Sequence, residues 1–307
     1  MRILLGCDCG SFFQGYGGIV DRFHKGEIAV QEMVGVRRFA ERLAGSVFHS
    51  MPEPAREFLS TLSFAAITWF DDRGRIWTTP ITGSPGFLLA KDESTIALDL
   101  LKCAAPLFAG QQFKNAPAAL VCMDFAGRRR MRVNGYVSSG NTLLFRAVEV
   151  YANCPKYIQR RTPDRALEPI DIESRSVMKA LLDEKSQKLI NSCDTFFIGS
   201  YAVAGGADAS HRGGASGFVK ADENSVRWVD YPGNNMFNTL GNIESNRESA
   251  LLFLNFQTRE GLALTGAIES FSPSSGGRSA EEETVFKVQS AKYMPRALAQ
   301  SWYEQPS

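Results

Sequence analysis

Apolar residues change their spacing along this chain, and the change marks where helices give way to strands. Residues 21–44 carry apolar side chains at helical spacing, which predicts one helix, and residues 53–62 predict a second. From Phe64 onward, apolar and β-branched residues form short runs separated by turn residues, as is typical of strands. The first two runs, 64–70 and 75–81, predict a hairpin.

Two further strands are predicted over 118–125 and 128–136. On the second strand, Arg130, Arg132 and Asn134 alternate with apolar residues, so they share one face. A row of arginines on a strand can bind phosphate or carboxylate, and it can equally face solvent on the outside of a sheet. The pattern leaves both interpretations open.

The rest of the chain adds one more predicted helix and a second β-rich stretch. The helix is predicted over 172–190, with Asp171 as its N-cap. Strand-like runs resume near Cys193 and end before a tail, 295–307, that we expect to be peripheral. Residues 1–18 are rich in glycine and predict a loose terminus.

The two β-rich stretches match each other, without a gap, at a constant separation of 131 positions. The matched positions include Gly86 with Gly217, 120–125 with 251–256, and Gly135 with Gly266. Chance rarely keeps one separation across glycines, an aromatic residue and an apolar run. We therefore interpret the chain as two copies of one β-unit, joined by a helical connector.

The copies differ in residues that a ligand site would need. The second copy has His211 and Arg212 where the first has Pro80 and Ile81. The first copy, in turn, has Arg130 and Arg132 where the second has Gly261 and Ala263. Two packed copies form a cleft between them, so we predict one site there, built from second-copy loops and first-copy arginines.

Residues 210–266 carry two polar, glycine-rich loops between strand-like runs. Glycine lets the backbone approach a ligand closely, and Arg, Ser, Thr and Asn donate hydrogen bonds to anions. The stretch predicts a cofactor site, although two ordinary β-turns would give the same composition. His211 is the candidate proton donor, with a hydrogen-bonded loop residue as the alternative. The candidate cofactor-binding residues are Arg212, Gly213, Gly214, Ser216, Asp230, Tyr231, Asn234, Asn235, Thr239, Asn242, Arg130 and Arg132.

Composition is that of a globular protein, with 44% apolar and 22% charged residues among 307. Lys and Arg number 34 against 33 Asp and Glu, so we expect no nucleic-acid or membrane partner. Six cysteines lack the C-x-x-C spacing and there are three histidines, which favours reduced thiols over a metal site or disulfides. No signal peptide or membrane-spanning run is recognisable, and we expect a cytoplasmic protein.

Several motifs together resemble a known superfamily. They are the Phe-His-x-Gly-Glu start at 23–27, Gly-Phe-Leu at 86–88, the arginine-rich run 124–135, Asn-Cys-Pro-Lys-Tyr-Ile-Gln at 153–159, and the loops 211–214 and 230–234. With them, the chain resembles the pyridoxamine 5'-phosphate oxidase-like, FMN-binding split-barrel superfamily, and more closely its tandem-barrel branch.

The resemblance implies a mainly β (α+β) fold of two tandem split β-barrels that form a pseudo-dimer, with an N-terminal helical segment and a helical connector. It divides the chain into 1–62, barrel one at 63–150, a connector at 151–192, barrel two at 193–290, and a tail at 291–307. It also implies FMN between the barrels, with FAD as an alternative. The family's Ser-Arg-Lys phosphate cluster is absent after Asp230, so the chain is not expected to be a pyridoxamine phosphate oxidase.

The function that follows from the resemblance is a flavin-dependent oxidoreductase acting on a small organic substrate, with NAD(P)H as a candidate electron donor. A homodimer of the duplicated chain is left open. The alternatives are a non-catalytic flavin carrier, a haem-binding barrel that would need a His or Cys ligand, and a ligand-free dimerisation module.

Overall fold

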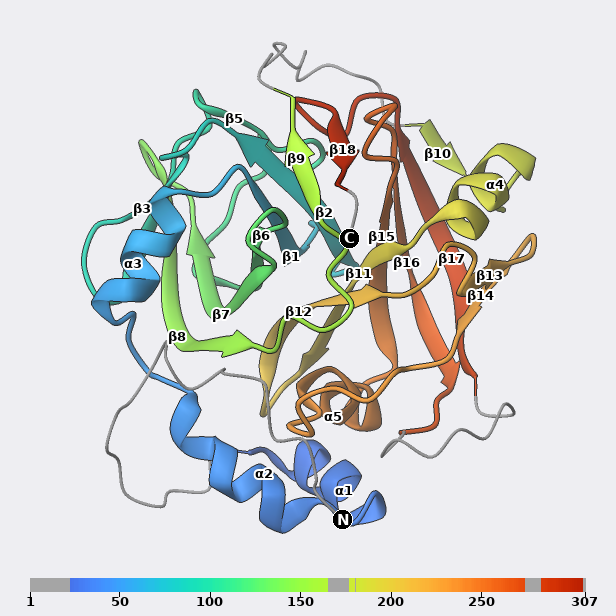
Figure 1. Ribbon diagram of the computed structural model, residues 1–307, viewed down its shortest axis with the longest axis horizontal. Helices are drawn as coiled ribbons and strands as arrows, with labels where there is room; N and C mark the ends of the chain where they lie inside the picture. Colours follow the sequence, from blue (N-terminus) through green and yellow to red (C-terminus); the bar gives the residue numbers. More distant parts are fainter. Residues whose placement is uncertain (1–22, 165–176, 180, 274–282, 306–307) are drawn as a thin grey trace.

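Two curled antiparallel sheets form the body of the protein, side by side in Figure 1. The computed structural model describes residues 23–164, 177–179, 181–273 and 283–305. Each sheet curls into a half-open barrel, and the helices lie around them. The predicted α+β fold of two tandem split barrels is confirmed, whereas the domain limits given above stay predictions.

The first sheet has the strand order β3-β4-β8-β7-β6-β1-β2-β5. Its strands are β1 (Phe64–Phe70), β2 (Ile76–Gly83), β3 (Leu88–Ala90), β4 (Thr95–Leu98), β5 (Cys103–Ala104), β6 (Ala116–Asp124), β7 (Arg129–Ser138) and β8 (Leu143–Asn153). The predicted hairpin and the two later strands are among them. All their pairings are antiparallel.

The second sheet has the order β12-β11-β15-β16-β17-β14-β13, and β10 pairs with β17. Its strands are β10 (Val177–Lys179), β11 (Thr195–Ala202), β12 (Gly206–Gly213), β13 (Val219–Ala221), β14 (Ser225–Trp228), β15 (Glu248–Leu254), β16 (Gly261–Ser270) and β17 (Thr284–Met294). Listed from β13 to β12, these seven strands correspond one to one, in the same order, to β3, β4, β8, β7, β6, β1 and β2 of the first sheet.

Local backbone features recur at the separation found in the sequence. Gly86 and Gly217, which precede β3 and β13, both have positive φ, a conformation that glycine adopts without steric cost. Gly135 and Gly266 each follow a register shift, and a Cβ at either would lie within about 2 Å of a carbonyl oxygen on the neighbouring strand. The repeated glycines therefore mark the same turn and the same bulge in each sheet. The constant separation ends at β17, because the β16–β17 connection is longer than that between β7 and β8.

The N-terminal helical segment is broken, contrary to the single helix predicted over 21–44. It consists of α1 (Lys25–Met33), α2 (Arg37–Leu43) and the short 3-10 helix η1 (Ala44–Ser46). The chain turns between α1 and α2 at Gly35, where φ is +75°. His24 is the N-cap of α1 and forms a capping box with Glu27. The predicted second helix is α3 (Glu53–Ser60).

The connector was predicted as one helix over 172–190, and this is wrong. The strand β10 occupies part of that range, and α4 (Glu184–Ser192) begins later, where Asp183 caps the backbone N–H of Ser186. Residue Asp171 lies outside the described residues, as do 1–18, Cys7 and Cys9. In the described part of the chain, no helix combines the length and apolar character needed to cross a membrane.

The C-terminal tail is not peripheral. Ala297, Leu298 and Trp302 are fully or almost fully buried, and β18 (Trp302–Glu304) pairs with β9 (Arg161–Pro163). The backbone N–H of Ala299 donates to Thr82 Oγ1 at 2.9 Å. Thr82 corresponds to Gly213 of the second copy, so the tail fills the first-copy counterpart of the predicted site.

The two barrels pack closely where β1 and β2 meet β11. The rings of Phe64 and Phe197 stack with centroids 5.3 Å apart. Gly199 corresponds to Thr68 of the first copy, and a Cβ added at Gly199 would lie 2.3 Å from Thr78 Oγ1 and 2.5 Å from Thr68 Oγ1. The second copy therefore needs glycine here, because the threonines of the first copy occupy the space.

Gly199→Ala is expected to destabilise the protein by about 1–3 kcal/mol, the usual range for overpacking a close-packed interior. Urea unfolding measures the change. Gly140→Ala is the matched control, because a Cβ there would meet only Thr142 O, at 3.7 Å. Equal stability of the two variants would contradict the close packing of β11 on the first barrel.

Candidate functional site

A cavity of about 110 Å³ lies where the two copies meet. The first copy contributes β7 and the segment that follows β8, and the second contributes β12, the loop after β14 and the start of α5 (Asn238–Ser245). Ten of the thirteen predicted site residues line it: Arg130, Arg132, His211, Arg212, Gly213, Asp230, Tyr231, Asn234, Asn235 and Thr239. The structure thus brings the polar loops and the arginine strand together.

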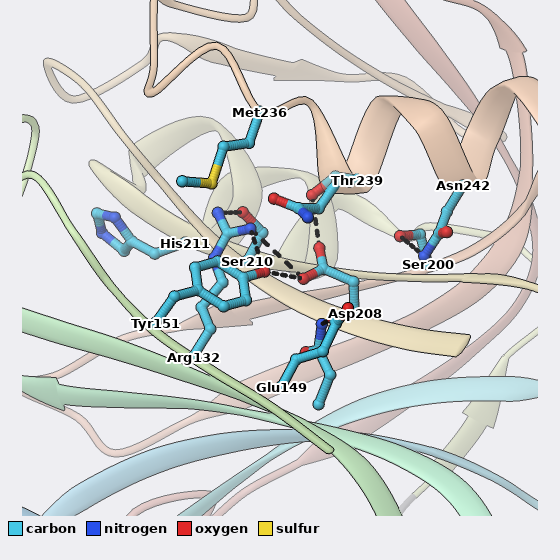
Figure 2. Close-up of polar contacts among 12 residues, drawn as sticks. Arg132, Glu149, Tyr151, Ser200, Asp208, Ser210, His211, Met236, Thr239 and Asn242 are labelled. Carbon is cyan, nitrogen blue, oxygen red and sulfur yellow. Dashed lines mark hydrogen bonds and ion pairs between the residues drawn. The ribbon is translucent and has the colours of Figure 1, made fainter. Parts of the chain in front are cut away.

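Three predicted residues do not line this cavity. Gly214 donates its backbone N–H to Asp194 O, and Ser216 Oγ donates to Ser192 O. Asn242 lines a different cavity, where its Nδ2 lies 3.3 Å from Ser200 Oγ (Figure 2). Because the Gly214 N–H has a backbone partner, a phosphate cradle built from the N–H groups of Gly213 and Gly214 does not fit this geometry.

The segment after β8 also lines the cavity, and the predicted site residues did not include it. Asn153, Cys154, Lys156 and Tyr157 all line the cavity. This segment carries one of the motifs of the family resemblance, and that was the only signal available for it. Neither periodicity nor charge marked it, since it follows a strand without forming a regular element of its own.

The arginine face of β7 is directed toward the second copy and not toward solvent. Arg132 is 7% exposed and Asn134 is 5% exposed, whereas Met131 and Val133 pack in the first-copy core. The solvated-face interpretation is therefore wrong for this strand. The exposed arginines are Arg128, in the preceding turn, and Arg129, the first residue of the strand, whose side chain belongs to the other face.

Arg132 and Asp208 form a buried ion pair that links the two copies (Figure 2). Arg132 NH1 lies 3.4 Å from Asp208 Oδ1. That oxygen also accepts from Tyr151 OH at 3.1 Å, and Asp208 Oδ2 accepts from Thr239 Oγ1 at 2.8 Å. Burial opposes the charge on Arg132, but Asp208 and Tyr151 outweigh it and raise the pKa of the guanidinium. The charge of Arg132 is thus balanced within the protein.

Arg130 differs from Arg132, because none of the described residues offers it a carboxylate. Its NH1 group donates to His211 Nδ1 and its NH2 group to Cys154 O, both at 2.9 Å, and its buried Nε has no partner. Burial, followed by the charges of Arg132 and Arg212, lowers the pKa of Arg130 to about 9. A buried cation without a counterion is unfavourable, and a bound anion would relieve this.

Arg212 has a counterion already. Its Nε lies 2.5 Å from Asp230 Oδ1, and its NH1 donates to Ser210 Oγ at 2.6 Å. Lys156 also lines the cavity. The three cations Arg130, Arg212 and Lys156 therefore face one carboxylate, that of Asp230, and the cavity carries an excess of positive charge.

His211 is held neutral in one tautomer. A guanidinium can only donate, so His211 Nδ1 must accept from Arg130, which places the ring proton on Nε2. Burial, and then the neighbouring arginines with Arg130 first, lower the pKa of His211 well below its usual value. Its buried Nε2–H lacks a partner. His211 therefore offers a hydrogen-bond donor and has no lone pair on Nε2 for a metal.

The remaining unpartnered groups include a further donor. The Nδ2 group of Asn234 is buried without a partner, while its Oδ1 accepts from Met236 N. The N-terminus of α5 also reaches the cavity through Asn238, Thr239 and Leu240, and helix N-termini favour anions. Donors and positive charge thus converge on one space, as expected of an anion site.

Aromatic side chains stand beside these donors. The rings of Tyr157 and Tyr231 lie 5.2 Å apart, and Phe218 stacks on Tyr231 at 6.1 Å. Tyr231 is 42% exposed. Trp228, at the end of β14, is part of the second-copy core and does not line the cavity. Cationic side chains and an edge of three aromatic rings, those of Tyr157, Tyr231 and Phe218, therefore line the same cavity.

Distant structural likenesses to solved proteins were found. A histidine-to-alanine variant of HupZ from Group A Streptococcus aligns at 12% identity over 37% of this chain and 99% of its own, with a TM-score of 0.29. An FAD-binding protein from Mesorhizobium loti aligns at 8% identity over 38% of this chain and 98% of its own, with a TM-score of 0.25. No family model and no curated protein matches the sequence.

His211 should make folding stability depend on pH. Its folded-state pKa is lowered, so below the unfolded-state value of about 6.5 the unfolded chain binds a proton that the folded chain does not. Stability is then lost as the pH falls from about 6.5 toward the folded-state pKa, by up to about 1.4 kcal/mol per pH unit. Urea unfolding between pH 7.5 and pH 5 measures it.

His211→Gln is expected to remove this part of the pH dependence. His49→Gln is the matched control, because His49 is exposed and should leave the wild-type pH dependence unchanged. A wild-type slope in the His211→Gln variant would show that folding does not lower the pKa of His211.

Proposed function

We propose that the cavity binds the phosphate of a flavin, FMN with FAD as the alternative, and that the chain is a flavin-dependent oxidoreductase of the pyridoxamine 5'-phosphate oxidase-like superfamily. The observation that carries the proposal is Arg130, a guanidinium whose Nε is buried without a partner and which has no carboxylate among the described residues. The tandem barrels and the motifs at 124–135 and 153–159 support the superfamily assignment.

The residues present fit such a group. Arg130 Nε, His211 Nε2 and Asn234 Nδ2 are buried donors without partners, and a phosphate can accept from all of them. The cavity of about 110 Å³ is smaller than the ~300–1,000 Å³ typical of whole-ligand sites. It suits the phosphate end, and the aromatic edge of Tyr157, Tyr231 and Phe218 suits the ring.

Each side chain has a defined part in this proposal. A bound flavin supplies the electron chemistry, and the protein supplies binding and orientation. Arg130 neutralises the phosphate, and Arg212, held by Asp230, offers its remaining N–H groups from a fixed position. His211 donates from Nε2, because Arg130 fixes its tautomer.

We expect one site in each chain. The first-copy counterpart has Pro80 and Ile81 in place of His211 and Arg212, and the tail around Ala297 and Leu298 fills the space. The haem alternative is less well supported, because the Arg130 contact gives His211 the tautomer that leaves no lone pair on Nε2.

Arg130→Ala is expected to weaken FMN binding by about 1.5–3 kcal/mol, the range for hydrogen bonds to charged groups. Arg212→Ala should also weaken FMN binding, because it leaves the Asp230 carboxylate without its cation beside the phosphate. Quenching of flavin fluorescence measures affinity and stoichiometry, which we expect to be one flavin per chain.

Arg128→Ala is the matched control, since Arg128 is exposed and immediately precedes the same strand. Riboflavin, which has no phosphate, should bind the wild type and Arg130→Ala equally. Unchanged FMN affinity in Arg130→Ala, or an equal loss with riboflavin, would exclude Arg130 as the phosphate ligand.

Reduction distinguishes an enzyme from a flavin carrier. We expect NADH or NADPH to bleach the flavin absorption of the loaded protein under anaerobic conditions, and air to restore it. Stopped-flow absorbance measures the rate. If neither nucleotide reduces the bound flavin faster than free FMN, NAD(P)H is not the donor; if dithionite-reduced protein also reacts with no candidate substrate, the carrier interpretation replaces the oxidoreductase.

A further inference from the structure

A second cavity, of about 210 Å³, lies on the other side of the Arg132–Asp208 pair. Residues of α1, β7, β8, β12 and α5 line it, so both copies and the N-terminal helix build it. Glu149 of β8 and Asp208 of β12 both line it, and Figure 2 shows the Asp208 carboxylate joined to Tyr151 and Thr239. The proposal for the phosphate site does not involve this space.

The unpartnered polar atoms of this cavity are mainly hydrogen-bond acceptors, whereas those of the first are donors; the exception is His24 Nε2, which carries the ring proton because Nδ1 accepts from Gly26 N. Asn134 Nδ2 donates to Glu149 Oε2 at 3.1 Å, and Asn238 Nδ2 donates to Glu27 Oε1 at 2.6 Å. Because both amide groups give their donors to carboxylates, their oxygens are left over. Asn134 Oδ1 and Asn238 Oδ1 are buried without a partner, and Asn134 is only 5% exposed. A buried acceptor of this kind needs a donor from a ligand or water.

The charges lining this cavity have one sign. Glu27, Glu149 and Asp208 line it, and no Lys or Arg does so among the described residues. His24 does not compensate, because burial lowers its pKa and its Nδ1 accepts from Gly26 N. Burial first, and then Glu149 and Asp208, raise the pKa of Glu27 to about 8. Because no cation neutralises Glu27, its carboxyl group holds a proton at pH 7 and is largely neutral.

We propose that this second cavity is a binding site for a small organic cation, whose ammonium N–H groups donate to Asn134 Oδ1, Asn238 Oδ1 and the Glu27 carboxylate. A protonated primary amine has three donors, which matches these three acceptors. A cavity of about 210 Å³ has room for several non-hydrogen atoms, since one water takes about 30 Å³.

A metal ion fits less well. In the described part of the chain, no three His, Cys, Asp or Glu side chains lie close enough together to hold one. The carboxylate of Asp208 is also committed to Tyr151, Arg132 and Thr239. The proposed ammonium group does not depend on Asp208, because its acceptors are the two amide oxygens and the Glu27 carboxylate.

Binding of the cation should be linked to protons through Glu27. The groups that face Glu27 are His24 on its own helix turn, Glu149 from β8 and Asp208 from β12, with Arg132 behind Asp208. Since a bound cation favours ionised Glu27, binding at pH 7 should release a proton. Affinity should then rise from pH 6 to about pH 9, where an alkylamine with a pKa near 10.4 is still charged.

Isothermal titration of the purified full chain with propylammonium chloride tests the proposal, with 1-propanol as the neutral counterpart and sodium chloride as the ionic-strength control. Saturable binding of one propylammonium per chain is expected, with heat that depends on buffer ionisation. Glu27→Gln and Glu149→Gln should each weaken binding about tenfold or more. Glu244→Gln is the matched control, because Glu244 is an exposed carboxylate on α5.

The variants and control ligands distinguish binding of an organic cation from the other outcomes. Two variants are used because Glu27 also caps α1; Glu149→Gln leaves that cap intact. The proposal is overturned if propylammonium gives no saturable heat, if propanol or sodium chloride gives the same signal, or if both variants bind as the wild type does. Saturation by magnesium chloride with the same dependence on Glu27 and Glu149 would assign the cavity to a metal instead. FMN titration of the same variants should be unchanged, so failure here is separable from failure of the flavin proposal.

Discussion

The buried ion pair between Arg132 and Asp208 joins the two halves of this chain, and the arrangement of both cavities depends on it. Burying two charges costs free energy unless their remaining hydrogen-bonding groups are satisfied. Here Tyr151, Thr239 and Ser210, which come from both copies and from α5, satisfy most of them, and Arg132 Nε is left without a partner. The pair therefore fixes how β7 of one barrel lies against β12 of the other.

The two cavities on either side of that ion pair are lined by side chains of opposite charge. One cavity is lined by cations and by unpartnered donors, among them groups of Arg130 and His211. The other is lined by carboxylates and mainly by unpartnered acceptors, among them Asn134 Oδ1. The ion pair between the two cavities is neutral overall, so it adds no net charge to either of them. Asn238 borders both spaces, so α5 is the one helix common to the two.

Duplication within one chain explains why this asymmetry can exist. In a homodimer, Thr68 would meet a second threonine at the pseudo-symmetric contact, whereas here it meets Gly199. The first-copy counterpart of the cleft likewise has Pro80 and Ile81 in place of His211 and Arg212, and the tail at Ala297 and Leu298 fills it. The chain keeps the fold of a dimer and concentrates its polar chemistry on one side.

The sequence by itself determined the repeat, most strands and the polar loops, because strand alternation and turn glycines are local properties that a constant separation of 131 makes visible twice. It also predicted that His211, Arg212 and the β7 arginines would meet. Only the tertiary structure decided what the arginine face contacts, where the tail packs, that Gly35 breaks the first helix, and that Tyr157 and Glu27 line cavities. Those features depend on contacts between residues far apart in the chain, and on charges whose partners, such as Asp208 for Arg132, no local pattern reveals.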